Sequence, residues 1–517
     1  MTAISMMAAT AKRPSLAPGY RHRILAGILL LVPADFLFWG QPVGINAFLF
    51  GIVLAGAVVA MHPAALSNWR VWLKPLALFA ALLPLVENVS PLSVLVAVAA
   101  LSIFALSLAG RLREAPARIA RQVGLFLLSA PFRFAFDFLR WRKAARELGQ
   151  RRIRLATIAV WVVPLTLGVV FLGLLSAANP IIEHWLSLID LHALLENIDI
   201  GRLVFWMIVL VGVWAFLRPR LPRFLARRRR VPPVRPPARP ARTAAEDILF
   251  GKAAILRALI VFNALFAMQT ALDAAYLWGG VALPDGLTYA AYAHRGAYPL
   301  VITALLAAAF VLAALRPGGE TSRDPLIRRL VYLWVAQNIA LVVSSMLRLD
   351  LYVDVYALTY LRVAAFIWMG LVAAGLALII ARIALAKSGE WLLSANLATL
   401  SATLYACCYV NFAALIANYN VDHSYEMNGP GTILDIWYAR SLGPAALPAL
   451  GRFFDHQQKV FPTDHRDGVD AVTEFHYRVQ QKNWRAWSFR DWRLLRTLDK
   501  SGPLANPAVS QHYAPGH

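Results

Sequence analysis

Eleven apolar stretches run along this chain, and the segments between them alternate between arginine-rich and arginine-poor. Short cytoplasmic loops of membrane proteins hold an excess of Lys and Arg. The alternation therefore predicts an all-α, polytopic helical membrane protein with about eleven transmembrane helices, its N-terminus in the cytoplasm and its C-terminus outside. The expected spans are 24–39, 43–61, 71–86, 92–109, 155–178, 203–217, 255–272, 298–315, 330–347, 363–383 and 391–417.

The charge of the chain follows this topology and does not indicate nucleic-acid binding. The net charge is +23, while 59% of residues are hydrophobic and only 15% are charged, which is far from the composition of soluble proteins. Almost all of the excess lies in residues 1–23, 111–154 and 218–252. Because these three segments are expected on the cytoplasmic side, the basicity is a topology signal and no nucleic-acid partner is expected.

Four parts are expected along the chain. Residues 1–217 form an N-terminal membrane half of six helices, and residues 246–419 form a C-terminal half of five. Between them, residues 218–245 form a linker that is rich in arginine and proline, typical of a solvated, extended segment. Residues 420–517 form an extracytoplasmic helical tail domain, in which 484–498 is an amphipathic stretch rich in Trp and Arg.

The basic loop before the fifth span contains a predicted amphipathic surface helix at about 118–148. Its polar stripe of Arg133, Asp137 and Arg140 follows helical spacing, and phenylalanines fill the rest of the surface. Such a helix lies in the head-group layer and is attracted to anionic lipid. The same partner suits the arginine-rich linker, although the linker is better explained as a determinant of topology between the two halves.

Polar residues recur on three helices of the second half, where apolar residues are the rule. Such residues usually face the interior of a helical bundle and mark functional positions. Helical spacing groups them into stripes that become more polar toward the outer end. The stripes are Gln269, Asp273 and Tyr276 on the seventh helix; Gln337, Asn338, Ser344, Ser345 and Arg348 on the ninth; and Tyr405, Cys408, Asn411, Asn418 and Asp422 on the eleventh.

Together with the outer loops, these stripes predict one pocket on the outer face. Arginine side chains suit phosphate and carboxylate groups, so an anionic lipid-linked substrate is a natural ligand, with Asp273 or His294 as general base. The candidate binding residues are Tyr276, Tyr289, Tyr292, Arg295, Arg348, Arg362, Asn411, Asn418 and His423.

Each candidate has a structural alternative. Arg348 and Arg362 are as well explained by pairing with acidic residues such as Asp273, Asp350 or Asp354 as by contact with a substrate. The asparagines commonly hold helices together, and the tyrosines suit an interfacial belt. No known metal or cofactor motif is present. The two cysteines, Cys407 and Cys408, are adjacent, where a mutual disulfide would be strained.

Several blocks of the second half also carry a family resemblance. They are Asp273–Gly280, Leu283–Gly286, Thr288, Tyr289, Tyr292–Pro299, Tyr332–Trp334, Gln337, Asn338, Ser344, Ser345, Leu347, Arg348, Arg362, Phe366–Trp368, Asn411, Phe412, Asn418–Val421, His423 and Ser424. In these blocks, roughly residues 245–460, the chain resembles a bacterial integral-membrane family known as domain of unknown function 4173, which is like family 4153. The resemblance implies a bacterial inner (plasma) membrane protein and supplies no activity. Tyr425 departs from the pattern, since the family usually has a charged residue there.

Three functions remain open. The first is an uncharacterised protein of the cell envelope that binds or processes an anionic lipid-linked substrate at the outer face. Extracytoplasmic glycosyltransferases place a catalytic acid in a long first outer loop, whereas this loop spans only residues 40–42 with Asp35 just inside. The second is a transporter or flippase, which requires polar stripes that continue to the cytoplasmic side. The third is a non-catalytic scaffold or sensor, for which the arginines and acids pair without a cavity.

Overall fold

The structure is a computed structural model that describes residues 19–62, 73–112, 116–147, 199–220, 252–278, 324–460 and 483–501, together with isolated positions between them. Every named element within these residues is a helix. Six of these helices are long and apolar enough to cross a membrane, or seven if the bent pair α18 and α19 counts as one span. The all-α, multi-pass prediction therefore holds for the described residues. The predicted spans 155–178 and 298–315 lie almost entirely outside them, so the number of eleven spans stays a prediction.

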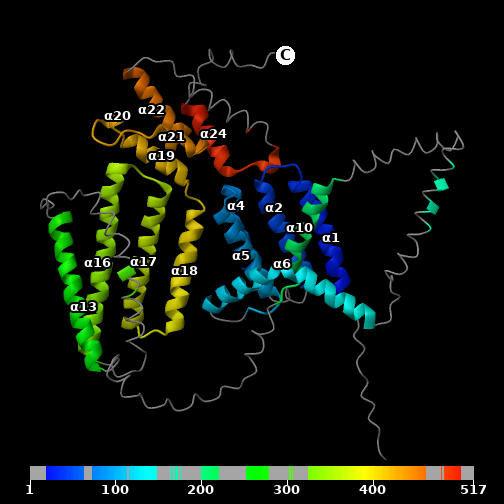
Figure 1. The fold of residues 1–517 in the computed structure, drawn as a ribbon, viewed down its shortest axis with the longest axis horizontal. Coiled ribbons are helices and arrows are strands. Elements are labelled where there is room, and N and C mark those ends of the chain that lie inside the picture. The colour runs from blue at the N-terminus through cyan, green and yellow to red at the C-terminus, as the bar shows by residue number, and fades with distance from the viewer. Residues whose placement is uncertain are drawn as a thin grey trace, which may run out of the picture.

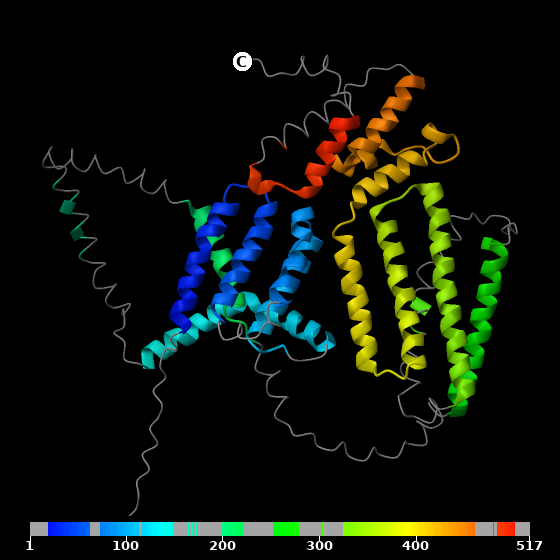
Figure 2. The same cartoon turned by 180° about the vertical axis from the view of Figure 1, so that it is seen from behind.

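The first half of the chain forms an N-terminal bundle, drawn in blue to green in Figures 1 and 2. Leucine, valine and phenylalanine side chains from α1, α2, α3, α5 and α10 form its core. Ser90 starts α5 by accepting from the Ser93 backbone N–H, and Pro91 occupies the first turn, where its missing N–H costs no hydrogen bond. The helices are α1 (Gly19–Phe38), α2 (Ile45–Ala60), α3 (Leu73–Leu82), α4 (Pro84–Glu87), α5 (Pro91–Leu108) and α10 (Ile200–Leu217).

The second half forms a C-terminal bundle, in which α16 lies between α13 and α17 (Figure 1). At its core Trp334 stacks on Phe262 with ring centroids 5.2 Å apart and meets Phe266 edge-on. Asp324 accepts from the backbone N–H groups of Leu326 and Ile327 and so begins the longest of these helices. The helices are α13 (Lys252–Asp273), a π-helical turn η4 (Ala274–Trp278), α16 (Pro325–Tyr356), α17 (Tyr360–Ala384) and α18 (Gly389–Cys407).

The remaining helices cover one end of the two bundles, drawn in yellow-orange to red in Figure 1. This cap has its own apolar core, in which Ile416, Ala417 and Val421 of α19 pack against Ala446 and Leu450. We call the end that it covers the capped end. The cap comprises α19 (Phe412–Asp422), α20 (Tyr425–Asn428), α21 (Ile436–Ser441), η5 (Pro444–Ala446), α22 (Leu447–Val460), η6 (Trp484–Ala486) and α24 (Phe489–Ser501).

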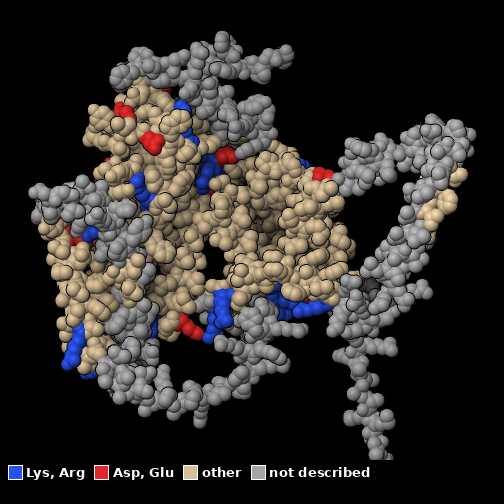
Figure 3. All heavy atoms as spheres, viewed as in Figure 1, with Lys and Arg blue, Asp and Glu red and all other residues tan. Residues whose placement is uncertain are grey.

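The opposite end carries most of the lysines and arginines of the described bundles, shown in blue in Figure 3, and we call it the basic end. There α6 (Pro116–Glu147) runs across the ends of α5 and α10 instead of alongside them (Figures 1 and 2). The segment 118–148, predicted to be a surface helix, is therefore helical over nearly its whole length. The assignment of the basic end to the cytoplasm stays a prediction.

The predicted span 391–417 is not one straight helix. It breaks into α18 and α19, which are bent by 70°, so α19 belongs to the cap. Asn411 causes the new start, because its side chain accepts from the Ala414 backbone N–H and caps α19. The predicted stripe from Tyr405 to Asp422 does not exist, since the bend separates its two parts.

Candidate functional site

Asp273 is the centre of a buried polar cluster near the capped end of the C-terminal bundle. Its carboxylate accepts from the Ser344 hydroxyl at 2.5 Å, from the Gln269 amide at 2.9 Å and from the Arg348 guanidinium. The side chains of Asp273 and Arg348 are only 2% and 3% exposed. Gln269 and Asp273 of the stripe predicted on the seventh helix therefore meet Ser344 and Arg348 of the stripe predicted on the ninth, and they meet around an ion pair.

This cluster lies at an irregular point in the backbone. At Asp273 the α-helix passes into the π-helical turn η4, which carries the half-buried Tyr276. Such turns often occur at functional sites. Here, however, the carboxylate accepts hydrogen bonds from Gln269, Ser344 and Arg348. Its oxygens therefore hold α13 against α16. The alternative in which Arg348 pairs with Asp273 is the one that the structure shows.

Arg362 lies at the turn between α16 and α17. Its guanidinium donates to the carbonyl oxygens of Tyr356 and Ala357 and lies 4.6 Å from the ring centroid of Tyr352. These carbonyls are at the end of α16, where Ala357 has a φ of 62°. Arg362 therefore stabilises the end of a helix, a role not anticipated for it, and the tyrosines pack against it.

Asn418 and His423 lie on the cap. Asn418 accepts from Arg452, which also pairs with Asp422 at 3.0 Å. The imidazole of His423 stacks on Tyr419, with ring centroids 4.0 Å apart. Burial raises the pKa of Tyr419, and Asp354 and Asp350 raise it further, so this hydroxyl stays protonated and donates to Asp354.

The described candidates thus share one end of the molecule but are held in separate contacts. His294, Arg295, Tyr289 and Tyr292 lie outside the described residues, so the predicted pocket as a whole stays a prediction. Toward the basic end, Asn263 and Asn338 are buried and donate to backbone carbonyls of their own helices. Asn263 also donates to the Leu330 carbonyl at 3.2 Å and so joins α13 to α16.

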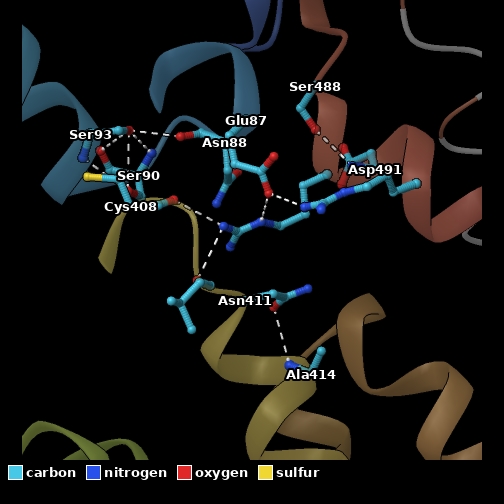
Figure 4. Close-up of polar contacts among 12 residues, drawn as sticks. Glu87, Asn88, Ser90, Ser93, Cys408, Asn411, Ala414, Ser488 and Asp491 are labelled. Carbon is cyan, nitrogen blue, oxygen red and sulfur yellow. Dashed lines mark hydrogen bonds and ion pairs between the residues drawn. The ribbon is translucent and has the colours of Figure 1, made fainter. Parts of the chain in front are cut away.

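A junction at the capped end joins the two bundles and the tail. Glu87, at the end of α4, accepts from Arg490 Nε at 3.3 Å and from Arg493. Arg490 Nη2 also donates to the carbonyl oxygens of Cys408 and Val410, at 3.2 and 3.3 Å. Figure 4 shows the Glu87 carboxylate directed toward α24. Cys408, at the α18–α19 break, lies on the opposite side of Glu87 from α24 in this view. One arginine therefore contacts three parts of the chain.

The tail is seated on the N-terminal bundle next to this junction. The Ile45 backbone N–H donates to the Trp487 carbonyl at 2.8 Å. A Cβ atom added at Gly44 would lie 2.3 Å from the carbonyl carbon of Ala486, so only glycine permits this approach. The Arg485 guanidinium covers Phe36 at 4.0 Å. The described part of the tail thus lies against the bundle, with η6 on α2 and α24 on α4, whereas the boundaries of a tail domain stay a prediction.

A second acid in the N-terminal bundle is also paired. Asp35 accepts from both the Nε and the Nη2 of Arg202 and from the Trp206 indole N–H at 2.8 Å. A carboxylate in this bidentate arrangement is an anchor between α1 and α10. The sequence singled out neither Arg202 nor the charged residues of the junction, although Glu87 was detectable as an acid at the end of an apolar span.

The family of the chain follows from a comparison with known families. A model described as Domain of unknown function (DUF4153) matches residues 73–453. The chain belongs to this family. The family is thus 4153 and not 4173, and its match begins at α3, far before residue 245. Glu87, Asp273 and Arg348 lie within it, whereas Arg490 lies beyond it. No curated protein and no solved structure matches the chain.

Proposed function

We propose that this DUF4153 protein is a cell-envelope membrane protein that binds an anionic lipid or lipid-linked molecule at the capped end. The arginines of α24 hold the head group. The substrate class is the one expected from the sequence. The head group, however, binds at α24 and not at Asp273 or Arg348, because these two side chains are buried and form an ion pair with each other.

The observation that carries this proposal is the row of guanidinium groups on α24. Arg493 is 50% exposed and lies 4.9 Å from the Phe489 ring, and the exposed Arg496 lies 4.0 Å from the Trp492 ring. Stacking on a ring keeps a guanidinium oriented while its N–H groups remain available for phosphate or carboxylate. Glu87 and Asp491 supply two negative charges against Arg490, Arg493 and Arg496, so one positive charge remains among these five groups.

The surroundings suit a lipid. Phe489 is exposed beside Arg493, and Trp484 is exposed in the preceding turn η6; aromatic side chains are typical of the head-group level. Near its two ends, α18 is tied to the N-terminal half by Tyr405, which donates to the Ala80 carbonyl, and by the ion pair of Glu390 with Arg118. Figure 3 shows an opening between the two halves at mid-height. An acyl or polyprenyl chain whose head group is held at α24 would enter this opening from the capped end.

The test compares binding of three probes to the full-length protein by native mass spectrometry. The probes are phosphatidylglycerol, a polyprenyl phosphate and zwitterionic phosphatidylcholine. We expect at least one anionic probe to bind about tenfold more tightly than phosphatidylcholine, and the double variant Arg493→Gln/Arg496→Gln to lose that preference, which corresponds to about 1.4 kcal/mol.

The two anionic probes separate a bulk lipid from a lipid-linked intermediate. The matched control is Arg452→Gln, which removes another half-exposed arginine at the same end and should bind as the wild type does. Equal binding of all three probes, or an unchanged preference in the α24 variant, would reject the proposal.

A non-catalytic scaffold is the second candidate, and one observation favours it. Among the described residues, four acids of the bundles and of α6 are each paired with an arginine. The pairs are Asp35 with Arg202, Glu87 with Arg490, Asp137 with Arg218, and Asp273 with Arg348. If no anionic probe is preferred, this closed arrangement makes the scaffold the better account.

A further inference from the structure

Helix α6 has its charged stripe turned toward the protein and an apolar stripe turned away. Arg133 and Asp137 are buried together with Phe126. On the opposite face, Leu128 is 74% and Phe132 61% exposed. The exposed stripe continues through Ala135, Phe136 and Leu139. Their spacing of three and four residues places them on one face of the helix.

The buried stripe is held by polar partners. Asp137 pairs with Arg218 at 3.1 Å and accepts from the Trp214 indole N–H at 3.3 Å. Arg133 donates to Ser129 and lies 4.3 Å from the Phe126 ring. Burial lowers the pKa of the nearby Arg220, Arg218 lowers it further and Asp137 opposes both. The orientation of α6 is therefore fixed by specific contacts with α10 and the residues that follow it.

Such an orientation is unfavourable in water. Large apolar side chains exposed to water cost about 25 cal/mol per Å² of surface, and a continuous apolar patch on a soluble surface is uncommon. When the same face contacts acyl chains, this free-energy cost of exposing apolar surface to water is absent. The exposed stripe of α6 thus fits a lipid environment, and the apolar perimeter of the adjacent bundle, such as Ile28 and Val32 on α1, is exposed in the same way.

The position of α6 indicates how it meets the lipid. Figures 1 and 2 show it crossing α5 and α10 at their basic ends, with a bend in its middle portion, where Pro131 lies within the helix. Phe126 packs against Phe216, with ring centroids 5.7 Å apart. If α5 and α10 span the bilayer, their ends and α6 lie at the level of the head groups.

We propose that α6 is an in-plane membrane helix, whose stripe of Leu128, Phe132, Ala135, Phe136 and Leu139 enters the acyl-chain region of the leaflet at the basic end. The exposed Arg140, which lies beside this stripe and not on it, is placed at the head groups, where its charge favours anionic lipid. This inference is independent of the site at α24, which lies at the other end of the molecule. The segment Arg118–Trp141 is long and apolar enough to cross a membrane, but its location across the helix ends places it in the plane.

The test is a depth measurement by spin-label accessibility in the full-length protein in nanodiscs of mixed anionic and zwitterionic lipid. A nitroxide is attached to the single introduced thiol of Leu128→Cys, Phe132→Cys or Leu139→Cys, with Cys407→Ser and Cys408→Ala in the background. An in-plane helix predicts similar shallow depths for all three labels, each more accessible to oxygen than to a water-soluble nickel complex.

Two other results would overturn the proposal. A helix that crosses the bilayer would give depths that change by about 1.5 Å per residue, or roughly 16 Å from position 128 to position 139. A face that binds a soluble protein would be accessible to the nickel complex at all three positions. The control is Leu385→Cys, an exposed position at the end of α17, which should be water-accessible. Ala135→Cys replaces any variant that fails to fold, because it removes no large side chain.

Discussion

Replacing Asp273 by alanine is expected to destabilise the protein by about 3–5 kcal/mol, because it leaves the guanidinium of Arg348 buried without its carboxylate. The same change removes an acceptor from Ser344 and Gln269. The measurement is thermal or denaturant unfolding of the purified full-length protein. Asp273→Asn is expected to have a smaller effect, since an amide oxygen still accepts from these donors.

Two controls distinguish a buried ion pair from a general loss of packing. The double variant Asp273→Leu/Arg348→Met replaces the pair by apolar side chains, and it should recover most of the lost stability. Glu390→Ala breaks a pair in which both side chains are more than half exposed, and it should cost less than about 1 kcal/mol. If Asp273→Ala is as stable as Glu390→Ala, the pair does not hold α13 to α16.

The second large effect is expected at the junction. Glu87→Ala leaves Arg490, which is only 17% exposed, beside an empty position, and we expect a loss of about 3 kcal/mol. Arg490→Ala should be at least as damaging, because it also removes the contacts with the carbonyls of Cys408 and Val410.

Hydrogen–deuterium exchange locates this effect. In Arg490→Ala, exchange should increase both in residues 483–501 and around the break at Cys408–Asn411. Arg493→Ala is the matched control, since this more exposed arginine contacts Glu87 but makes no contact with the break; only α24 should then exchange faster. Unchanged exchange at the break in Arg490→Ala would contradict the role of the junction.

The parts of the fold that were predictable from sequence are those with a local pattern. Apolar runs gave α2, α5, α10, α13 and α17 with nearly the observed bounds, and the spacing of Arg133 and Asp137 indicated a helix at α6. Helical spacing also placed Ser344 and Arg348 on one face, which both contact Asp273. A pattern of this kind depends only on neighbours within a few turns.

The features that were missed depend on which elements pack together. Glu87 and Arg490 are 403 positions apart, and no periodicity connects them. The spacing in α6 revealed two stripes but not which one faces the protein, because an amphipathic helix at a membrane has lipid as well as protein to contact. The break before α19 had a readable signal in Asn411, a good N-cap residue, which an uninterrupted apolar run concealed.

A lipid site at α24 on the outer face requires the capped end to lie on the outer side of the membrane. Labelling with a membrane-impermeant maleimide tests this directly, using Trp437→Cys in the cap and Leu385→Cys at the basic end, positions that are 82% and 61% exposed. The background again carries Cys407→Ser and Cys408→Ala. We expect position 437 to be labelled in intact cells with a permeabilised outer membrane, and position 385 only after the inner membrane is opened. Labelling of position 385 alone in intact cells would contradict the account, because α24 would then face the cytoplasm.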